Sequence, residues 1–246
     1  MKRVGIIGCG AIGSLIAEAV DQGIVQCEEL ILYDSDKEKA ERLQESLDTS
    51  TILVSNFDEM LNLRPTVIVE AASQEAVSEY LDKIIDNNID VIVMSVGALL
   101  GSSLKSDKIH TTSGAIGGLD AISSAALTGI NEVVLTTRKH PKTLDMDNTQ
   151  EKLVYEGSAY QAVRRFPREM NVAASLALTV QPDKILVRVI SDPKAIRNTH
   201  EISVRWKHGD MLLRFANDPH PENPKTSALA AWAAIRLLKN ILEKRG

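Results

Sequence analysis

Three glycines near the start of the chain have the spacing of a dinucleotide-binding loop. Gly8, Gly10 and Gly13 follow an apolar run at residues 4–7, and residues 14–17 continue in the pattern of a helix. In a strand–turn–helix of this kind the first glycine permits a tight turn, the second lets the backbone approach a pyrophosphate, and the third lets the helix pack closely on the strand. The motif therefore predicts a site for dinucleotide phosphates at the helix N-terminus.

An acidic residue at a suitable distance strengthens this prediction. A second apolar run at 29–33 ends in Asp34, about twenty residues beyond Gly13, where a carboxylate accepts hydrogen bonds from an adenosine ribose. Ala11 and Ile12, between the last two glycines, are expected to contact the cofactor as well. The glycines could instead serve packing alone, and Asp34 could be a solvated cap. However, the glycine motif, the two strands, the helix and the acidic residue all occur at the spacing of a dinucleotide site.

The charge of Asp34 bears on which cofactor the loop binds. A carboxylate at this position repels the 2′-phosphate of NADP, which favours NAD. Lys37 and Lys39 follow closely in the sequence and could hold that phosphate if the loop turned towards it. NADP therefore stays open as the alternative cofactor.

The length and charge of the chain narrow the classes of partner. With 246 residues the chain can form two domains, and its net charge of −5 comes without any long basic block. Binding of nucleic acid needs clustered lysine and arginine, so this charge pattern argues against it. No apolar run approaches the roughly 18 residues of a membrane span. We expect a small-molecule substrate and neither a nucleic acid nor a membrane as partner.

The cysteines indicate a reducing compartment. Cys9 and Cys27 are the two cysteines, which predicts neither a disulfide framework nor a cysteine-rich metal site. No His, Cys or Asp cluster has metal-ligand spacing, so we expect no metal. The first strand begins too early for a signal peptide. These features together predict a cytoplasmic protein.

Strand and helix patterns alternate through the first half of the chain. Runs without polar alternation lie at 66–70 and 91–95, as is typical of parallel strands buried on both faces, and helical patterns separate them from one another and from the runs already described. Right-handed crossovers would wind them into an α/β fold with a Rossmann-type doubly wound parallel sheet, which binds ligand at the carboxyl ends of its strands. Ala71, directly after the run at 66–70, is therefore expected at the cofactor. We assign residues 1–109 to this dinucleotide-binding domain.

Alternating apolar and polar patterns indicate a second domain of different character. Strand-like runs lie at 132–137, 152–156, 185–190, 202–206 and 211–215. Helical patterns begin near Ser158 and cover 171–179. A mixed sheet plus helices suits a separate α+β catalytic domain, which we assign to residues 110–225. A last helical pattern at 226–246 is expected to pack back on the first domain.

Two features of the second half could carry chemistry. Residues 113–120 place three glycines among small residues, so Gly117 and Gly118 could present backbone donors to a ligand, although an ordinary helix N-terminal turn is the alternative. His200 begins a strand directly after the polar stretch 192–199. An imidazole there could transfer protons near neutral pH, although a lone histidine is more often structural or solvated.

Two further segments could bind ligand groups. Asn171 opens an apolar helix, where capping is the default role, although its amide could hold a nicotinamide carboxamide. Lys225, Thr226 and Ser227 stand where a proline-rich loop enters the last helix. Their charge, hydroxyls and backbone N–H groups could bind a carboxylate. A proline-stiffened turn capped by Thr226 is the alternative there.

Taken together, these segments resemble the archaeal and bacterial L-aspartate dehydrogenase family along nearly the whole chain. The motifs that carry the resemblance are the glycine loop, E-A-A-S-Q-E-A-V at 70–77, S-G-A-I-G-G-L-D-A at 113–121, F-P-R-E-M-N-V-A-A at 166–174, N-T-H-E-I at 198–202 and E-N-P-K-T-S at 222–227. The resemblance implies that His200 is the catalytic histidine and that Ala115 and Asn171 contact the cofactor. Members commonly have N-V-N-V-A-A where this chain has Glu169 and Met170 before Asn171, so the first polar position is lost while Asn171 is kept.

The resemblance also implies an activity and an assembly. Members are typically homodimers that oxidise L-aspartate with NAD or NADP to iminoaspartate, which gives oxaloacetate and ammonia and can feed NAD biosynthesis. A neutral imidazole could accept a proton or activate water for hydrolysis of the imine. The two substrate carboxylates need cationic or N–H partners. The candidates are Lys225, Thr226, Ser227, Gly117 and Gly118.

Two other hypotheses compete with this one. A Rossmann half joined to a smaller mixed sheet also serves reductases of the dihydrodipicolinate-reductase type, which act on a cyclic imine. A protein that senses dinucleotides without turnover is the other possibility, and in it His200 would be structural. Formation of NADH that depends on L-aspartate would separate the first hypothesis from both.

Overall fold

The computed structural model describes residues 2–167, 169–180, 185–218 and 227–244. The chain divides into two compact units, one made of the residues up to Thr112 together with those from Ala231 onward, and one made of Ser113–Ala230. Within the described ranges, no helix combines the length and the apolar character needed to cross a membrane.

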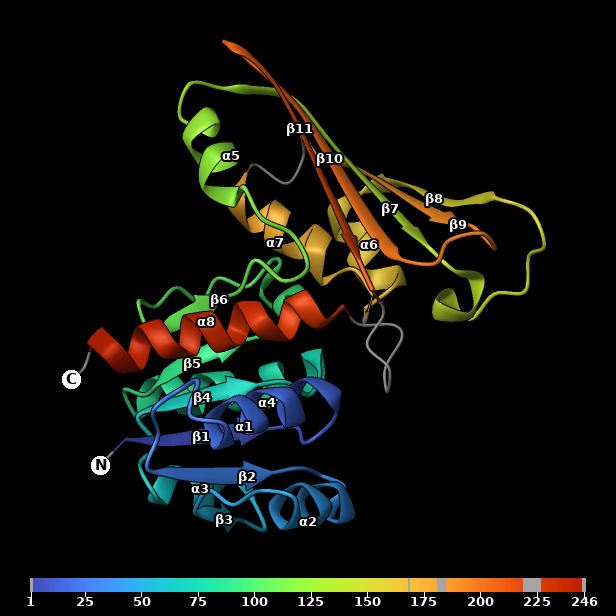
Figure 1. The fold of residues 1–246 in the computed structure, drawn as a ribbon. Coiled ribbons are helices and arrows are strands. Elements are labelled where there is room, and N and C mark those ends of the chain that lie inside the picture. Colours follow the sequence, from blue (N-terminus) through green and yellow to red (C-terminus); the bar gives the residue numbers. More distant parts are fainter. Residues whose placement is uncertain (1, 168, 181–184, 219–226, 245–246) are drawn as a thin grey trace. The chain divides into compact units, whose positions relative to one another are not determined.

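The first unit is built on a six-stranded parallel sheet (Figure 1). Its strands are β1 (Arg3–Ile7), β2 (Glu29–Tyr33), β3 (Thr51–Leu53), β4 (Val67–Glu70), β5 (Asp90–Val93) and β6 (Ile109–Thr111). They lie in the order β3-β2-β1-β4-β5-β6 and all neighbours are parallel, so the winding reverses between β1 and β4. This order confirms the predicted Rossmann-type sheet, in which ligands bind at the carboxyl ends of the strands beside that reversal.

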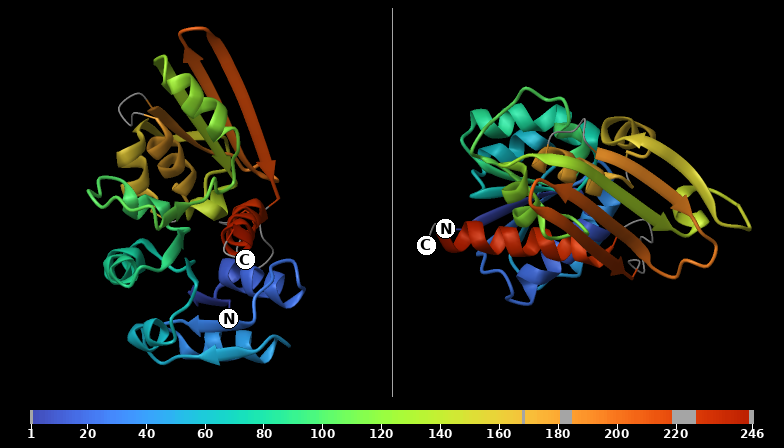
Figure 2. Two further views of the ribbon diagram at one scale, coloured as in Figure 1. Left: turned by 90° about the vertical axis from the view of Figure 1, so that its left-hand side faces the viewer. Right: turned by 90° about the horizontal axis from the view of Figure 1, so that it is seen from above.

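Helices cover both faces of this sheet. They are α1 (Ala11–Asp21), α2 (Lys37–Glu45), α3 (Phe57–Asn62), α4 (Gln74–Asp86) and α8 (Ala228–Lys244), with a short 3₁₀ helix η1 (Val96–Leu99). The left view of Figure 2 shows α1 and α8 on one face and α3 and α4 on the other. The side chains of Asn56 and Ser73 accept hydrogen bonds from backbone amides in the first turns of α3 and α4, which fixes where these helices begin.

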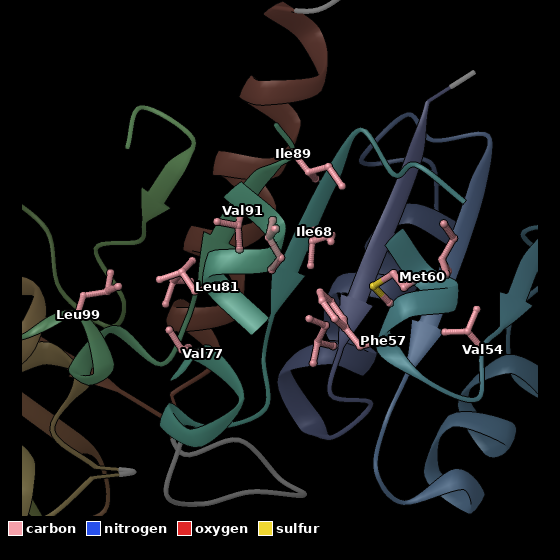
Figure 3. Close-up of a cluster of buried hydrophobic side chains, with 13 residues drawn as sticks. Val54, Phe57, Met60, Ile68, Val77, Leu81, Ile89, Val91 and Leu99 are labelled. Carbon is pink, nitrogen blue, oxygen red and sulfur yellow. The ribbon is translucent and has the colours of Figure 1, made fainter. Parts of the chain in front are cut away.

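A hydrophobic core lies between the sheet and the helices α3 and α4 (Figure 3). Phe57 and Met60 come from α3 and Leu81 from α4, and Ile68 in β4 and Val91 in β5 meet them from the sheet. Burial of one such side chain stabilises the fold by roughly 1.5–3 kcal/mol relative to exposure. This layer therefore holds in place the strands that carry the glycine loop and the acidic residues at their ends.

The second unit is built on a five-stranded mixed sheet (Figure 1). Its elements are β7 (Ile130–Lys139), β8 (Lys152–Ser158), β9 (Ile185–Ser191), β10 (Asn198–Trp206), β11 (Gly209–Asn217), α5 (Leu119–Ala126), α6 (Ala159–Arg165), α7 (Asn171–Thr179) and the 3₁₀ helix η2 (Pro141–Leu144). The strand order is β11-β10-β7-β9-β8, with β7 and β9 parallel and the other neighbours antiparallel. This arrangement confirms the predicted α+β fold of a mixed sheet plus helices.

Helices α5, α6 and α7 cover one face of this second sheet, as the views in Figures 1 and 2 agree. Burial alternates along the strands accordingly. In β10, His200, Ile202 and Val204 are buried, whereas Glu201 and Ser203 are exposed. We call the helix-covered side the covered face and the other side the open face.

The sequence does not predict strand β6, and it offers helix α5 only as the alternative of a helix N-terminal turn at residues 113–120. β6 has three residues, too few for a periodic pattern to show, and it extends the first sheet beyond β5. Its residues lie in the first unit, whereas the sequence places the start of the second domain at residue 110. α5 begins after Gly118, whose φ of +74° a glycine adopts without strain.

Candidate cofactor and catalytic sites

The three glycines of the N-terminal loop meet three different physical requirements. Gly8 has a φ of +94°, and a Cβ there would lie 2.8 Å from the backbone of Ala71. A Cβ on Gly13 would collide with the carbonyl oxygen of Gly8. Gly10, in contrast, has nothing within 4 Å of the position that its Cβ would take. Gly8 and Gly13 are thus glycine for internal packing, while the open space at Gly10 fits the approach of a pyrophosphate.

The carboxylate of Asp34 is held against this loop. Its Oδ2 accepts a hydrogen bond from the backbone amide of Cys9 at 2.7 Å, and its Oδ1 accepts one from the amide of Asp36 at 2.8 Å. Burial, and after it the charge of Asp34, raises the pKa of the Cys9 thiol to about 12. Cys9 is therefore a packed thiol within the loop, and Asp34 is fixed at the end of β2.

A cavity of about 280 Å³ opens beside Asp34. Its lining residues are Tyr33, Asp34, Ser35, Lys37, Ala40, Leu53, Val54 and Ser55. Lys37 forms an ion pair with Glu41 at 3.1 Å, while Lys39 pairs with Asp36 at 3.4 Å and does not line the cavity. Apolar walls with a few fixed polar groups are typical of small-molecule sites, and a carboxylate at the rim suits a ribose diol.

A buried carboxyl group joins the ends of β4 and β5. Glu70 is 2% exposed, and its Oε1 accepts hydrogen bonds from the Ala72 amide and the Ser95 hydroxyl, both at 2.9 Å. Its Oε2 accepts one from the Ser95 amide at 2.9 Å. Burial raises the pKa of Glu70, and these hydrogen bonds oppose the shift. They also fix the backbone around Ala71, which packs on Gly8; the sequence places this segment at the cofactor but assigns Glu70 no role.

His200 lies on the covered face of the second sheet. The residue is 2% exposed, and its Nδ1 lies 3.0 Å from the hydroxyl of Thr137, the residue opposite it in β7. Burial, and after it the positive charge of Lys139, lowers the pKa of the imidazole to about 3. His200 is therefore neutral at physiological pH, which is the form that can accept a proton.

Buried polar side chains gather around His200 at one end of the covered face. This polar end consists of Thr137, Lys139, Ser191, Asn198 and His200. Further along the same strands the buried side chains are aliphatic, among them Val133, Leu135, Val187, Ile202 and Val204. Sequence reasoning missed Lys139. The signal that could have found it is the alternation of β7, which puts a lysine at an inward position.

The loop before α5 takes its shape from strand β11. The side-chain amide of Asn217 donates a hydrogen bond to the carbonyl of Ala115 at 3.0 Å. A Cβ on Gly117 would meet the ring of Phe215 at 3.5 Å, and one on Gly118 would collide with another β11 side chain. The φ of +74° explains why Gly118 is glycine, so a role in substrate binding stays a prediction for both.

The remaining candidates are placed as follows. Asn171 is the first residue of α7, and Met170 holds the N-cap position, so the capping role considered for Asn171 is wrong. Ser227 is buried directly before α8, whereas Lys225 and Thr226 lie outside the described residues. In the part of the chain that the structure describes, no three His, Cys, Asp or Glu side chains are arranged to hold a metal ion.

Comparison with known proteins shows the family to which the chain belongs. Residues 120–241 match the family model "Aspartate dehydrogenase, C-terminal", and residues 8–117 match "Homoserine dehydrogenase, NAD binding domain". A protein named L-aspartate dehydrogenase from Methanothermobacter thermautotrophicus is 40% identical over 255 residues, which cover 99% of this chain and 97% of that protein. The chain belongs to the L-aspartate dehydrogenase family.

Other members of the L-aspartate dehydrogenase family agree with this placement. The protein of that name from Methanosarcina mazei is 38% identical, with 98% of this chain and 97% of that protein covered. The crystal structure of aspartate dehydrogenase from Thermotoga maritima shares 28% identity and superposes with a TM-score of 0.76, covering 98% of this chain and 97% of that one. Membership confirms the resemblance seen in the sequence and makes the chain an oxidoreductase with a domain for a nicotinamide dinucleotide.

Proposed function

We propose that the protein oxidises L-aspartate with a nicotinamide dinucleotide, giving iminoaspartate and then oxaloacetate and ammonia. The observation that carries the proposal is the buried, neutral imidazole of His200 in a chain that is 40% identical to a protein named L-aspartate dehydrogenase. A nicotinamide ring, when bound, supplies the acceptor for the hydride that leaves Cα of the substrate.

The first unit would bind the cofactor. The proposed contacts are Gly8, Gly10, Ala11, Ile12, Gly13, Asp34, Ala71, Ala115 and Asn171, the last two from the second unit. The open space at Gly10 and the N-terminus of α1 support a pyrophosphate there. The fixed carboxylate of Asp34 supports a ribose diol and therefore NAD, while Lys37 in the same cavity keeps NADP as the alternative.

His200 would handle the protons of the reaction. The Cα–H bond of aspartate breaks with both electrons leaving as hydride, the amine loses a proton to the imidazole, and a C=N bond forms. The imidazolium returns its proton to the imine nitrogen, the neutral imidazole then takes a proton from the water that adds to the carbon of that bond, and ammonia leaves with this proton. Proposed partners of the two substrate carboxylates are Gly117, Gly118, Lys225, Thr226 and Ser227.

We also propose the compartment of the protein, its assembly and the pathway that it serves. We infer a cytoplasmic homodimer that supplies iminoaspartate for NAD biosynthesis, with residues 1–109 and 226–246 serving the cofactor and 110–225 serving catalysis and dimer formation. Light scattering on the purified protein tests the dimer.

One assay tests the activity. Absorbance at 340 nm is followed with L-aspartate and either NAD or NADP, and we expect reduced cofactor to appear at a rate that depends on L-aspartate. Oxaloacetate with ammonia should reverse the reaction. Turnover of a cyclic imine with none of L-aspartate would favour a reductase of the dihydrodipicolinate type, and cofactor binding without any turnover would favour a sensor.

A further inference from the structure

A buried lysine ends the strand that pairs with the strand of His200. Lys139 is the last residue of β7 and is 3% exposed, although lysine is rarely so deeply buried. Its neighbour Arg138 points to the open face and forms an ion pair with Asp192 at 2.8 Å. Arg138 and Lys139 are successive cations, and Lys139 is the one that is buried on the covered face. The other inward residues of β7 are uncharged.

The cross-strand register brings Lys139 close to His200. His200 lies opposite Thr137, and Lys139 is two residues further along β7 on the same face, a step of about 7 Å along a strand. On its other side Lys139 lies opposite Ser191 of β9. The lysine is thus built into the middle of the sheet, within reach of a small molecule that contacts the imidazole.

The charge of Lys139 acts on the imidazole. It is the second cause, after burial, of the lowered pKa of His200. Thr137, Ser191 and Asn198, which complete the polar end, carry no charge. The positive charge of Lys139 therefore reaches the space beside His200, and a small anion complements that charge.

We propose that Lys139 binds a carboxylate of the substrate beside His200 and so makes the site selective for a dicarboxylic amino acid. This inference rests on the proposed function, because L-aspartate has two carboxylates to place. A charge-assisted hydrogen bond to an ammonium group is about twice as strong as one between neutral groups, and more so away from bulk water. An amide in the place of that carboxylate would bind Lys139 much less well.

The same contact prepares His200 for proton transfer. A carboxylate on Lys139 offsets the positive potential at the imidazole, which moves the pKa of His200 upward, towards the range useful for a base. Nδ1 is engaged by Thr137, so Nε2 takes the proton of the substrate amine. His200 then becomes an effective base after the substrate has bound.

Steady-state kinetics on Lys139→Met test the inference, with Lys142→Met as the matched control because Lys142 is an exposed lysine three residues on. We expect Lys139→Met to raise KM for L-aspartate roughly 30-fold or more, with a smaller effect on kcat, since loss of one partner of a buried charge pair is costly. Lys139→Arg should recover most of the affinity. Lys142→Met should behave as wild type, and NAD affinity should be unchanged in all three.

Substrate discrimination gives a second measurement that a structural role would not move. Two ratios of kcat/KM are measured, that of L-aspartate to L-asparagine and that of L-aspartate to its α-amide. One of these amides lacks the carboxylate that Lys139 binds, and the ratio for that amide should fall in Lys139→Met. An unchanged KM, a loss confined to kcat, or an equal loss for diacid and both amides would overturn the inference. If Lys139→Met does not fold, Lys139→Gln carries the same test. Absence of L-aspartate turnover in the wild type would instead overturn the proposed function, and this inference with it.

Discussion

The backbone amide of Cys9 donates a hydrogen bond to the Asp34 carboxylate across 2.7 Å. This contact ties the glycine loop after β1 to the end of β2, so one side chain both shapes the glycine loop and lines the cavity beside β2. Asp34 also accepts the Asp36 amide with its other oxygen, which keeps the carboxylate from rotating. A substitution that removes the Asp34 carboxylate should therefore be compared with one that preserves the hydrogen bond from the Cys9 amide.

Removal of the Asp34 charge should change the choice of cofactor. We expect Asp34→Ala to weaken NAD binding roughly 10- to 100-fold, because a hydrogen bond to a charged group is lost, and to improve relative use of NADP. Asp34→Asn keeps an oxygen for the Cys9 amide but lacks the charge, so it should retain the loop and lose the selectivity. Kd values for both cofactors measure this. A wild type that strongly prefers NADP would contradict the role given to Asp34.

The glycines of the loop should separate binding from stability. Gly10→Val should keep the melting temperature close to that of the wild type, because space is open at its Cβ, and should block the pyrophosphate. Gly13→Ala should instead lower the melting temperature, since its Cβ would collide with the Gly8 carbonyl oxygen. Calorimetric titration with NAD and thermal melts measure the two effects. Normal NAD affinity in Gly10→Val would remove the phosphate-loop interpretation.

Loss of the imidazole should act on the chemical step. His200→Ala should lower kcat on L-aspartate by roughly two or more orders of magnitude, as loss of a general acid–base group does, while cofactor affinity changes little. An effect mainly on KM would mean that His200 positions the substrate, and a large drop in melting temperature would mean that it is structural. A folded variant with near-normal kcat would rule out the catalytic role while the dehydrogenase assignment stood.

The buried imidazole should also make stability depend on pH. The pKa of His200 is lowered from 6.5 to about 3, so above pH 6.5 the group is neutral in both the folded and the unfolded chain. Below pH 6.5 the unfolded chain takes up a proton that the folded chain excludes, and the free energy of unfolding falls as the pH falls towards 3. Chemical denaturation without substrate should show this slope reduced by up to about 1.4 kcal/mol per pH unit in His200→Gln. His208→Gln, at an exposed position, is the matched control.

Local sequence patterns were sufficient for the framework of both units. The glycine loop, the strand before it and Asp34 follow from spacing within one βαβ segment, and β4 and β5 follow from runs without polar alternation. The three-residue strand β6 is too short to carry a period, and the packing of its neighbours decides it.

The candidate sites were predictable where they depend on a motif and not where they depend on register. Glu70 accepts a hydrogen bond from Ser95, which follows another strand of the sheet. Lys139 acts on His200, which lies in a neighbouring strand. Neither partner is close in sequence, so no local pattern pairs them. Within their own strands, Glu70 and Lys139 are recognisable only as charged residues at buried positions.

Helix α8 has a consequence for the synthesis of the chain on the ribosome. Its residues Ala234, Ile235, Leu238 and Leu242 are buried, and the Lys2 ammonium donates a hydrogen bond to the Leu242 carbonyl, so the first unit is completed by a helix that is made after the second unit. At about 5–20 residues per second, the second unit is translated over roughly ten seconds while the face awaiting α8 stays uncovered. The second unit is thus an insertion between two parts of the first, and the nascent chain must keep an apolar surface from aggregating until α8 emerges.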